Sequence, residues 1–111
     1  MDHLGNGMEH RWGERVRVNI SVHMSAGGVA GIDGSIKNLS LSGALMRSDC
    51  ELRLHALIDV HIKLRAPSLR VDIVKAHVSR RLENYVGIEW YEFAPAIVKD
   101  LLRSPSLRLP A

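Results

Sequence analysis

Two groups of polar residues in the first half of the chain could bind a small charged ligand. The first is R-W-G-E-R, in which Arg11 and Arg15 are separated by three residues that include a glycine. The second is N-L-S-L-S-G, which contains Asn38, Ser40 and Gly43. Guanidinium groups fork onto phosphates and stack on flat rings, while an amide and a hydroxyl can match the edge of a base. Together the two groups predict a site for a small anionic nucleotide with purine bases.

The second group, residues 38–43, is unusual for a β-strand. Asparagine and glycine are depleted in strands, so the chain either bends here or holds something polar. In an extended strand Asn38 and Ser40 would project to the same face, and Gly43 would let a flat ligand lie close to the backbone. A purely structural interpretation is a bend closed by bonds from side chains to the nearby backbone. Both interpretations can hold, because a rigid turn presents polar groups well.

Alternation of apolar and polar residues predicts the strands that must position these groups. The clearest run spans residues 16–24, and its inward-facing residues are Val16, Val18, Ile20, Val22 and Met24. Further strands are expected over residues 29–37, 44–47, 57–64, 69–78 and 86–90. Strands with such clean alternation form antiparallel sheets that bury one face.

Two further details of the pattern predict local geometry. Apolar residues of one parity end at Ile73 and those of the other parity begin at Val74, which predicts a β-bulge there. Near the end of the chain Pro95 suits a first helical position, and the apolar stripe that follows is Ile97, Val98, Leu101 and Leu102. Six short strands followed by one short helix predict an all-β fold, either a closed barrel or a sandwich, with the helix over one opening.

Composition narrows the class of protein. A length of 111 residues fits one domain, and no apolar run approaches the roughly 18 residues of a membrane-spanning helix. The polar N-terminus lacks the layout of a secretory signal, and Cys50, the single cysteine, suits a reducing cytoplasm and is expected to be inert. The net charge is +3 and most of the 15 basic residues are arginine, which favours a phosphate-bearing ligand.

The order of these motifs resembles the PilZ domain family. The matching features are Arg11-x-x-x-Arg15 ahead of the first strand, Asn38-x-Ser40-x-x-Gly43 between the second and third, and Y-V-G-I-E-W at residues 85–90 as the last strand. PilZ domains are bacterial receptors for cyclic di-GMP, built as a six-stranded antiparallel β-barrel with a C-terminal helix. The resemblance extends from Arg11 to about residue 102. It implies a flexible N-terminal arm over residues 1–14, a barrel with its helix over residues 15–103, and a tail over residues 104–111.

The resemblance also implies roles for individual residues. Arg11 and Arg15 would hold phosphates and stack on guanine, Asn38 and Ser40 would bond a guanine edge, and Gly43 would leave room for the base. The family more often has aspartate where this chain has Asn38, and Glu14 adds a negative charge between the arginines. Three further candidate ligand-binding residues are His10, Trp12 and Arg17.

The resulting prediction is a cytoplasmic, non-catalytic receptor for cyclic di-GMP that orders its arm on binding and signals to a separate effector protein. No cofactor, metal site, membrane span or nucleic-acid polymer is expected as part of this function, since the six histidines lack zinc-like spacing and no long basic run occurs. One alternative is an adaptor of the same fold that docks onto a motility or pilus component without nucleotide. Another is a small barrel that binds single-stranded nucleic acid, which would show a steep dependence on salt.

Overall fold

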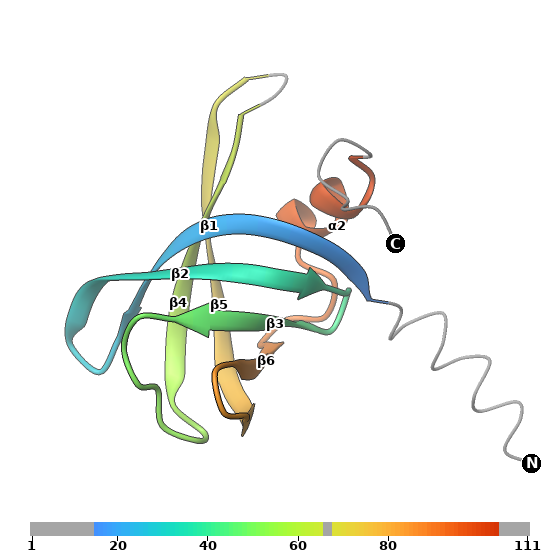
Figure 1. The fold of residues 1–111 in the computed structure, drawn as a ribbon. Coiled ribbons are helices and arrows are strands. Elements are labelled where there is room, and N and C mark those ends of the chain that lie inside the picture. Colours follow the sequence, from blue (N-terminus) through green and yellow to red (C-terminus); the bar gives the residue numbers. More distant parts are fainter. Residues whose placement is uncertain (1–14, 66–67, 105–111) are drawn as a thin grey trace, which may run out of the picture.

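A computed structural model describes residues 15–65 and 68–104, and these form six antiparallel strands and one helix (Figure 1). The strands close into a barrel in the order β1-β2-β3-β6-β5-β4. The elements are β1 (Val16–Ala26), β2 (Val29–Leu39), β3 (Gly43–Ser48), β4 (Leu57–Leu64), β5 (Arg70–Arg81), β6 (Val86–Trp90) and α2 (Ala96–Leu102). The predicted fold class, an antiparallel barrel with a C-terminal helix, is confirmed.

Alternating residues of every strand fill the interior of the barrel, as the sequence pattern predicts. In β1 the residues Val18, Ile20, Val22 and Met24 are buried while the residues between them are exposed. The same alternation places Ile58, Val60 and Ile62 of β4 and Val86, Ile88 and Trp90 of β6 in the core. A closed barrel of this size has no room for a ligand inside, so any binding site must lie on its rim or outer surface.

A β-bulge interrupts β2 close to the second polar group. Ile36 and Leu39 are both fully buried although they are three residues apart. The register with β3 shifts between Ile36 and Asn38, so Lys37 and Asn38 together occupy the outer surface between the two buried residues. The bulge therefore turns Asn38 away from the core.

The predicted bulge near Ile73 and Val74 in β5 is wrong. The pairing of β5 with β4 runs without a shift from Leu57 opposite His77 to Leu64 opposite Arg70. Val74 faces the core, and Ile73 and the preceding odd-numbered residues face solvent instead. The register shift of β5 lies farther along, between Val78 and Arg80, in its pairing with β6. The apolar residues switch from odd to even positions in the sequence because the first half of β5 carries apolar residues on its outer face, whereas the second half carries them only on its inner face.

The helix α2 lies beside the barrel where β1 separates from the β4–β5 hairpin (Figure 1). It buries Ile97, Val98 and Leu101, as its apolar stripe predicts, and Pro95 forms the N-cap rather than the first helical residue. Asp100 of the helix accepts a hydrogen bond of 2.7 Å from Arg70. Bonds to Asp72 and then to Asp100 raise the pKa of Arg70 above its ordinary value, so this cation ties the helix to the hairpin.

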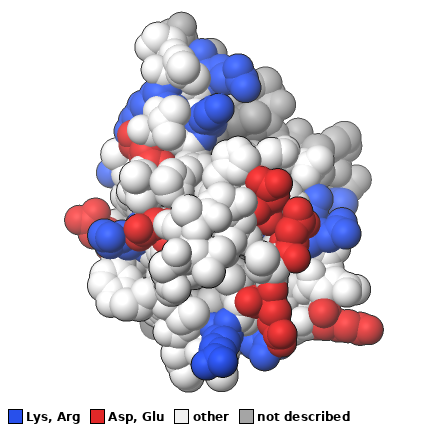
Figure 2. All heavy atoms as spheres, turned by 90° about the vertical axis from the view of Figure 1, so that its left-hand side faces the viewer, with Lys and Arg blue, Asp and Glu red and all other residues white. Residues whose placement is uncertain are grey.

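Charged side chains of both signs are scattered over the face of the molecule shown in Figure 2, and several basic residues lie at its upper end. This end corresponds to the tip of the β4–β5 hairpin, which extends above the barrel in Figure 1. In the described part of the chain no helix has the length and apolar character needed to cross a membrane. Within the same residues no three histidine, cysteine or acidic side chains come together in a way suited to a metal ion.

Candidate functional site

The second arginine of the first motif meets the asparagine of the second motif. Arg15, just before β1, donates a hydrogen bond of 2.8 Å from Nη1 to Oδ1 of Asn38 at the end of β2. The two side chains come together because β1 and β2 are antiparallel neighbours and Arg17 pairs directly with Asn38. Residues that lie 23 positions apart in the sequence are thus joined on the outer surface of the barrel.

Basic groups surround this contact. Arg15 and Arg17 are exposed, and the bulge places Lys37 beside Asn38 on the same outer surface. The Lys37 ammonium donates a hydrogen bond of 2.9 Å to Oδ1 of Asn19 in β1. Among residues 15–65 and 68–104, no carboxylate forms an ion pair with these three cations.

Ser40 occupies a different position from the one expected of it. β2 ends at Leu39, and Ser40 is fully buried in the turn that follows, so it does not share an exposed strand face with Asn38. Its hydroxyl lies 3.3 Å from the backbone N–H of Ser42 and 3.2 Å from that of Gly43, both of which donate to it. The side chain of Ser40 therefore closes the turn, which is the structural interpretation that the sequence left open.

The last strand anchors this turn from behind. The indole N–H of Trp90 donates to the carbonyl of Ser40 at 3.2 Å, and the backbone N–H of Trp90 donates to the carbonyl of Ser42 at 3.0 Å. The backbone N–H of Ala94 donates to the carbonyl of Leu41 at 2.9 Å. Three carbonyls of the turn are thus satisfied by the segment that ends β6, so the turn is a rigid part of the site.

Gly43 is fixed by its neighbour in β6. A Cβ atom added at Gly43 would overlap the backbone carbonyl of Ile88, so a side chain cannot be accommodated unless the two strands move apart. The glycine is also buried, and it begins β3 opposite Glu89. The structure thus gives Gly43 a role in strand packing, whereas the sequence suggested space for a ligand.

The structure brings together part of the predicted site. Arg15, Arg17 and Asn38 share one outer surface, and Ser40 and Gly43 form the turn immediately behind it. Three other predicted residues, His10, Arg11 and Trp12, lie outside the described residues, so their placement relative to Asn38 stays a prediction.

Two residues that the sequence did not single out also shape the site. Lys37 is the third cation on the surface around Asn38, and Trp90 holds the turn. The signal for the first was the three-residue spacing of Ile36 and Leu39, which cannot both face inward in a regular strand. The signal for the second was an indole among core residues, because a buried Trp N–H requires an acceptor.

The site combines an exposed arginine, an outward asparagine on a bulge and a rigid turn, all on a closed antiparallel barrel. Comparison with known proteins identifies the family to which such a domain belongs. The PilZ domain family matches residues 9–104, so this chain belongs to the PilZ family. This is a family of cyclic di-GMP receptors.

A solved structure has the same fold. It is a crystal structure of the PilZ domain of CeSA from a cellulose synthesizing bacterium, with a TM-score of 0.62 and 17% sequence identity. The match covers 81% of this chain and 92% of that one. No curated protein matches this chain.

Proposed function

We propose that this domain binds cyclic di-GMP at the surface formed by the start of β1, the bulge of β2 and the turn that follows. The contact of 2.8 Å between Arg15 and Asn38 carries the proposal, because it unites the two motifs that the family uses for this ligand. Membership of the family and the basic surface around Asn38 support it further.

The residues would divide the work by their chemistry. Arg15 would break its hydrogen bond with Asn38 and bind a phosphate through two N–H groups of its guanidinium. Arg17 and Lys37 would add positive charge around the same phosphates. The amide of Asn38, once released, would bond a guanine edge. Ser40 and Gly43 would act by shaping the turn, since both are buried. Arg11, from the N-terminal arm, would supply a second guanidinium.

Binding would order the N-terminal arm, and the free-energy cost of this ordering limits the affinity. Each arginine–phosphate bond contributes about 1.5–3 kcal/mol, and each residue fixed in one conformation costs about 1–2 kcal/mol. Two such contacts cannot offset the ordering of several residues, so stacking of arginine on guanine is needed as well. Micromolar binding, about −8 kcal/mol, is the expected result.

The output would be an altered surface that a separate effector protein recognises. In this role the domain is a cytoplasmic adaptor that hydrolyses nothing, and the ordered arm together with the barrel and α2 forms the signal. The proposal of a separate effector follows the adaptor activity expected of the family.

Isothermal titration with cyclic di-GMP tests the proposal. The intact chain should release or absorb heat with a micromolar Kd, and Arg15→Ala should weaken binding about 10- to 100-fold, in line with the loss of one charge-assisted contact. Arg11→Ala should have a similar effect. Arg81→Ala is the matched control, because this exposed arginine lies on β5, separated from β2 by β3 and β6 in the barrel, and pairs with Glu51.

Two results would count against the proposal. One is an absence of binding by a chain whose unfolding transition is intact. The other is equal affinity for the Arg15 variant and the Arg81 control. Either result would favour the alternative function, an adaptor that acts without nucleotide. Binding of a partner protein that is unaffected by both Arg11→Ala and Arg15→Ala would then support that alternative.

A further inference from the structure

Exposed apolar side chains lie on the outer face of the first half of β5 and on residues near it. Leu69 is 66% exposed, Val71 50% and Ile73 58%, and Tyr91 beyond the end of β6 is 64% exposed. The first three stand at every second position, so they line one face of an extended segment. Single exposed apolar residues are ordinary on a protein surface, but a continuous row beside a groove indicates an interaction site.

Part of this segment of β5 also has an edge without a strand partner among residues 15–65 and 68–104. β5 pairs with β4 along Arg70–His77, but its pairing with β6 begins only at Ala76. The carbonyl of Lys75 accepts the last bond from that side, from the backbone N–H of Tyr91 at 2.9 Å. In an antiparallel strand alternate residues direct their N–H and C=O groups to the same side. The backbone groups of Val71 and Ile73 therefore point to an edge that has no strand partner among the described residues.

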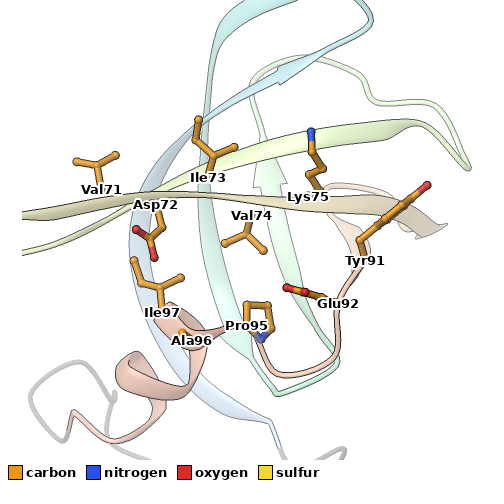
Figure 3. A pocket seen from close by; sticks show the side chains of 10 residues that line it. All are labelled: Val71, Asp72, Ile73, Val74, Lys75, Tyr91, Glu92, Pro95, Ala96 and Ile97. Carbon is orange, nitrogen blue, oxygen red and sulfur yellow. The ribbon is translucent and has the colours of Figure 1, made fainter.

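A groove lies along this edge (Figure 3). Its volume is about 740 Å³, and its lining consists of residues 71–75 on one side and of Tyr91, Glu92 and residues 95–97 on the other. In Figure 3 the side chains of Val71 and Ile73 stand on the outer side of β5, whereas Asp72 and Val74 turn toward the helix. Since the groove is walled on both sides, it suits a single extended chain better than the edge of another folded sheet.

The charge of the groove favours a basic occupant. Lys75 is paired with Asp59 at 3.2 Å, and Asp72 is paired with Arg70 at 2.9 Å. Glu92 is exposed at the opposite wall and has no ion-pair partner among the described residues. Its carboxylate points into the space between β5 and Pro95 (Figure 3). A cationic side chain on the occupant would complement it.

We propose that an extended segment of the effector protein adds to the free edge of β5 as a further strand. Its backbone would bond the exposed groups of Val71 and Ile73, its apolar side chains would cover those two residues and Tyr91, and a lysine or arginine would approach Glu92. This inference rests on the proposed adaptor role for the identity of the partner. Its geometry is independent of the nucleotide site, which lies on β1 and β2.

A peptide of alternating lysine and valine, blocked at both ends, is the probe for this groove. Titrated into the full chain labelled with nitrogen-15, it should shift the amide signals of Val71, Ile73, Tyr91 and Glu92. A peptide of alternating glutamate and valine should bind about tenfold more weakly, because it places carboxylates near Glu92. Both titrations are made with and without cyclic di-GMP, so that failure of nucleotide binding and failure of the groove are separate results.

Variants with matched controls test separately the apolar contacts and the charge of Glu92, the two proposed sources of recognition. The double substitution Val71→Thr and Ile73→Thr keeps β-branched residues in the strand and should weaken the lysine–valine peptide about tenfold. Val29→Thr removes a similarly exposed apolar side chain, 55% exposed, from the start of β2 and should leave affinity unchanged. Glu92→Gln should reduce the preference for the lysine peptide over the glutamate peptide, whereas Glu83→Gln in the β5–β6 turn should not.

Other occupants of the groove would give different results, and each would overturn the proposal. If residues 105–111 fill the groove, their deletion should increase hydrogen exchange at Val71 and Ile73. If a second copy fills it, the chain should sediment as a dimer that the double threonine variant dissociates. Absence of shifts at the four groove amides with either peptide, or equal affinity of the double variant and the Val29 control, would also reject it.

Discussion

The indole N–H of Trp90 donates to the carbonyl of Ser40 across 3.2 Å, and this bond connects the last strand to the turn beside the candidate site. The two residues are 50 positions apart, so the turn acquires its shape only when β6 is in place. Ser40 in turn uses its hydroxyl to hold the backbone of Gly43. The conformation of the second motif is thus a property of the closed barrel and not of the motif alone.

Replacing Trp90 by phenylalanine should destabilise the fold and loosen the turn. A phenyl ring remains, but the pyrrole ring and its N–H are lost, so the carbonyl of Ser40 becomes a buried acceptor without a donor, which costs about 1–3 kcal/mol. Urea unfolding should show the loss, and the affinity for cyclic di-GMP should fall with it. Tyr91→Phe, at an exposed neighbour, should change the free energy of unfolding by less than about 0.5 kcal/mol. Equal stability of the two variants would mean that the indole bond does not hold the turn.

Gly43→Ala should be the more damaging change in the same turn. The new methyl group would overlap the carbonyl of Ile88, and separation of β3 from β6 would be required to relieve the contact. Overpacking of this kind costs about 1–3 kcal/mol, and the upper end is expected because the opposing atom belongs to the backbone. Ser42→Ala, one residue earlier, is the control: it removes only the bond of 3.2 Å between its hydroxyl and that of Ser40, so it should cost no more than about 1 kcal/mol. Wild-type stability of the Gly43 variant would contradict the close approach of the strands.

Lys37→Gln should weaken cyclic di-GMP binding modestly and reduce its dependence on salt. The lysine has no carboxylate partner in the described part of the chain, and its bond to Asn19 places it on the outer surface around Asn38. The loss of one nearby charge at an exposed position should lower affinity about threefold. Titrations at low and high salt measure the effect, with Lys63→Gln on the hairpin as control. A salt dependence unchanged by the Lys37 substitution would remove this lysine from the site.

The fold was predictable because its strands bury one face. Strict alternation in β1 and β4 placed the core residues correctly, from Val18 to Ile62, without knowledge of any contact. The same logic failed in β5, where Val71 and Ile73 are apolar but face solvent. Periodicity cannot separate an apolar residue that faces the core from one that faces a groove or a partner. The same outward-facing apolar residues of β5 therefore explain both the wrong bulge prediction and the proposed docking site.

The site was predictable in part for a similar reason. The chemistry of Arg15 and Asn38 can be read from residue type, and antiparallel pairing of β1 with β2 brings them together. The burial of Ser40 and the close approach of Ile88 to Gly43 depend on β6, which follows more than 40 residues later in the sequence. Sequence motifs therefore located the site, but they did not distinguish residues that face the ligand from residues that shape the turn.

Asp100→Asn should loosen α2 slightly, without a pH dependence near neutrality. Asp100 accepts from Arg70 at 2.7 Å, but both side chains are more than one-third exposed, so water screens the pair. The pKa of Arg70 is raised, so its contribution is complete below the pKa of an unfolded arginine and is lost only as pH rises through the higher folded value. Urea unfolding of the chain and the variant at several pH values near neutrality should give a small, constant difference. A difference that grows across this range would identify another titrating group at the helix.

Asn38→Asp should strengthen the binding of cyclic di-GMP, while Asn38→Ala should weaken it. A carboxylate offers two acceptor oxygens to a guanine edge where the amide offers one, and bonds to a charged acceptor are about twice as strong as neutral ones. The carboxylate would also hold Arg15 more firmly before the ligand arrives, which offsets part of the gain. We therefore expect a net increase in affinity of about threefold for aspartate and a loss of about tenfold for alanine. Titration calorimetry of the three proteins at one salt concentration gives the order, and an alanine variant that binds as well as the parent would exclude Asn38 from contact with the ligand.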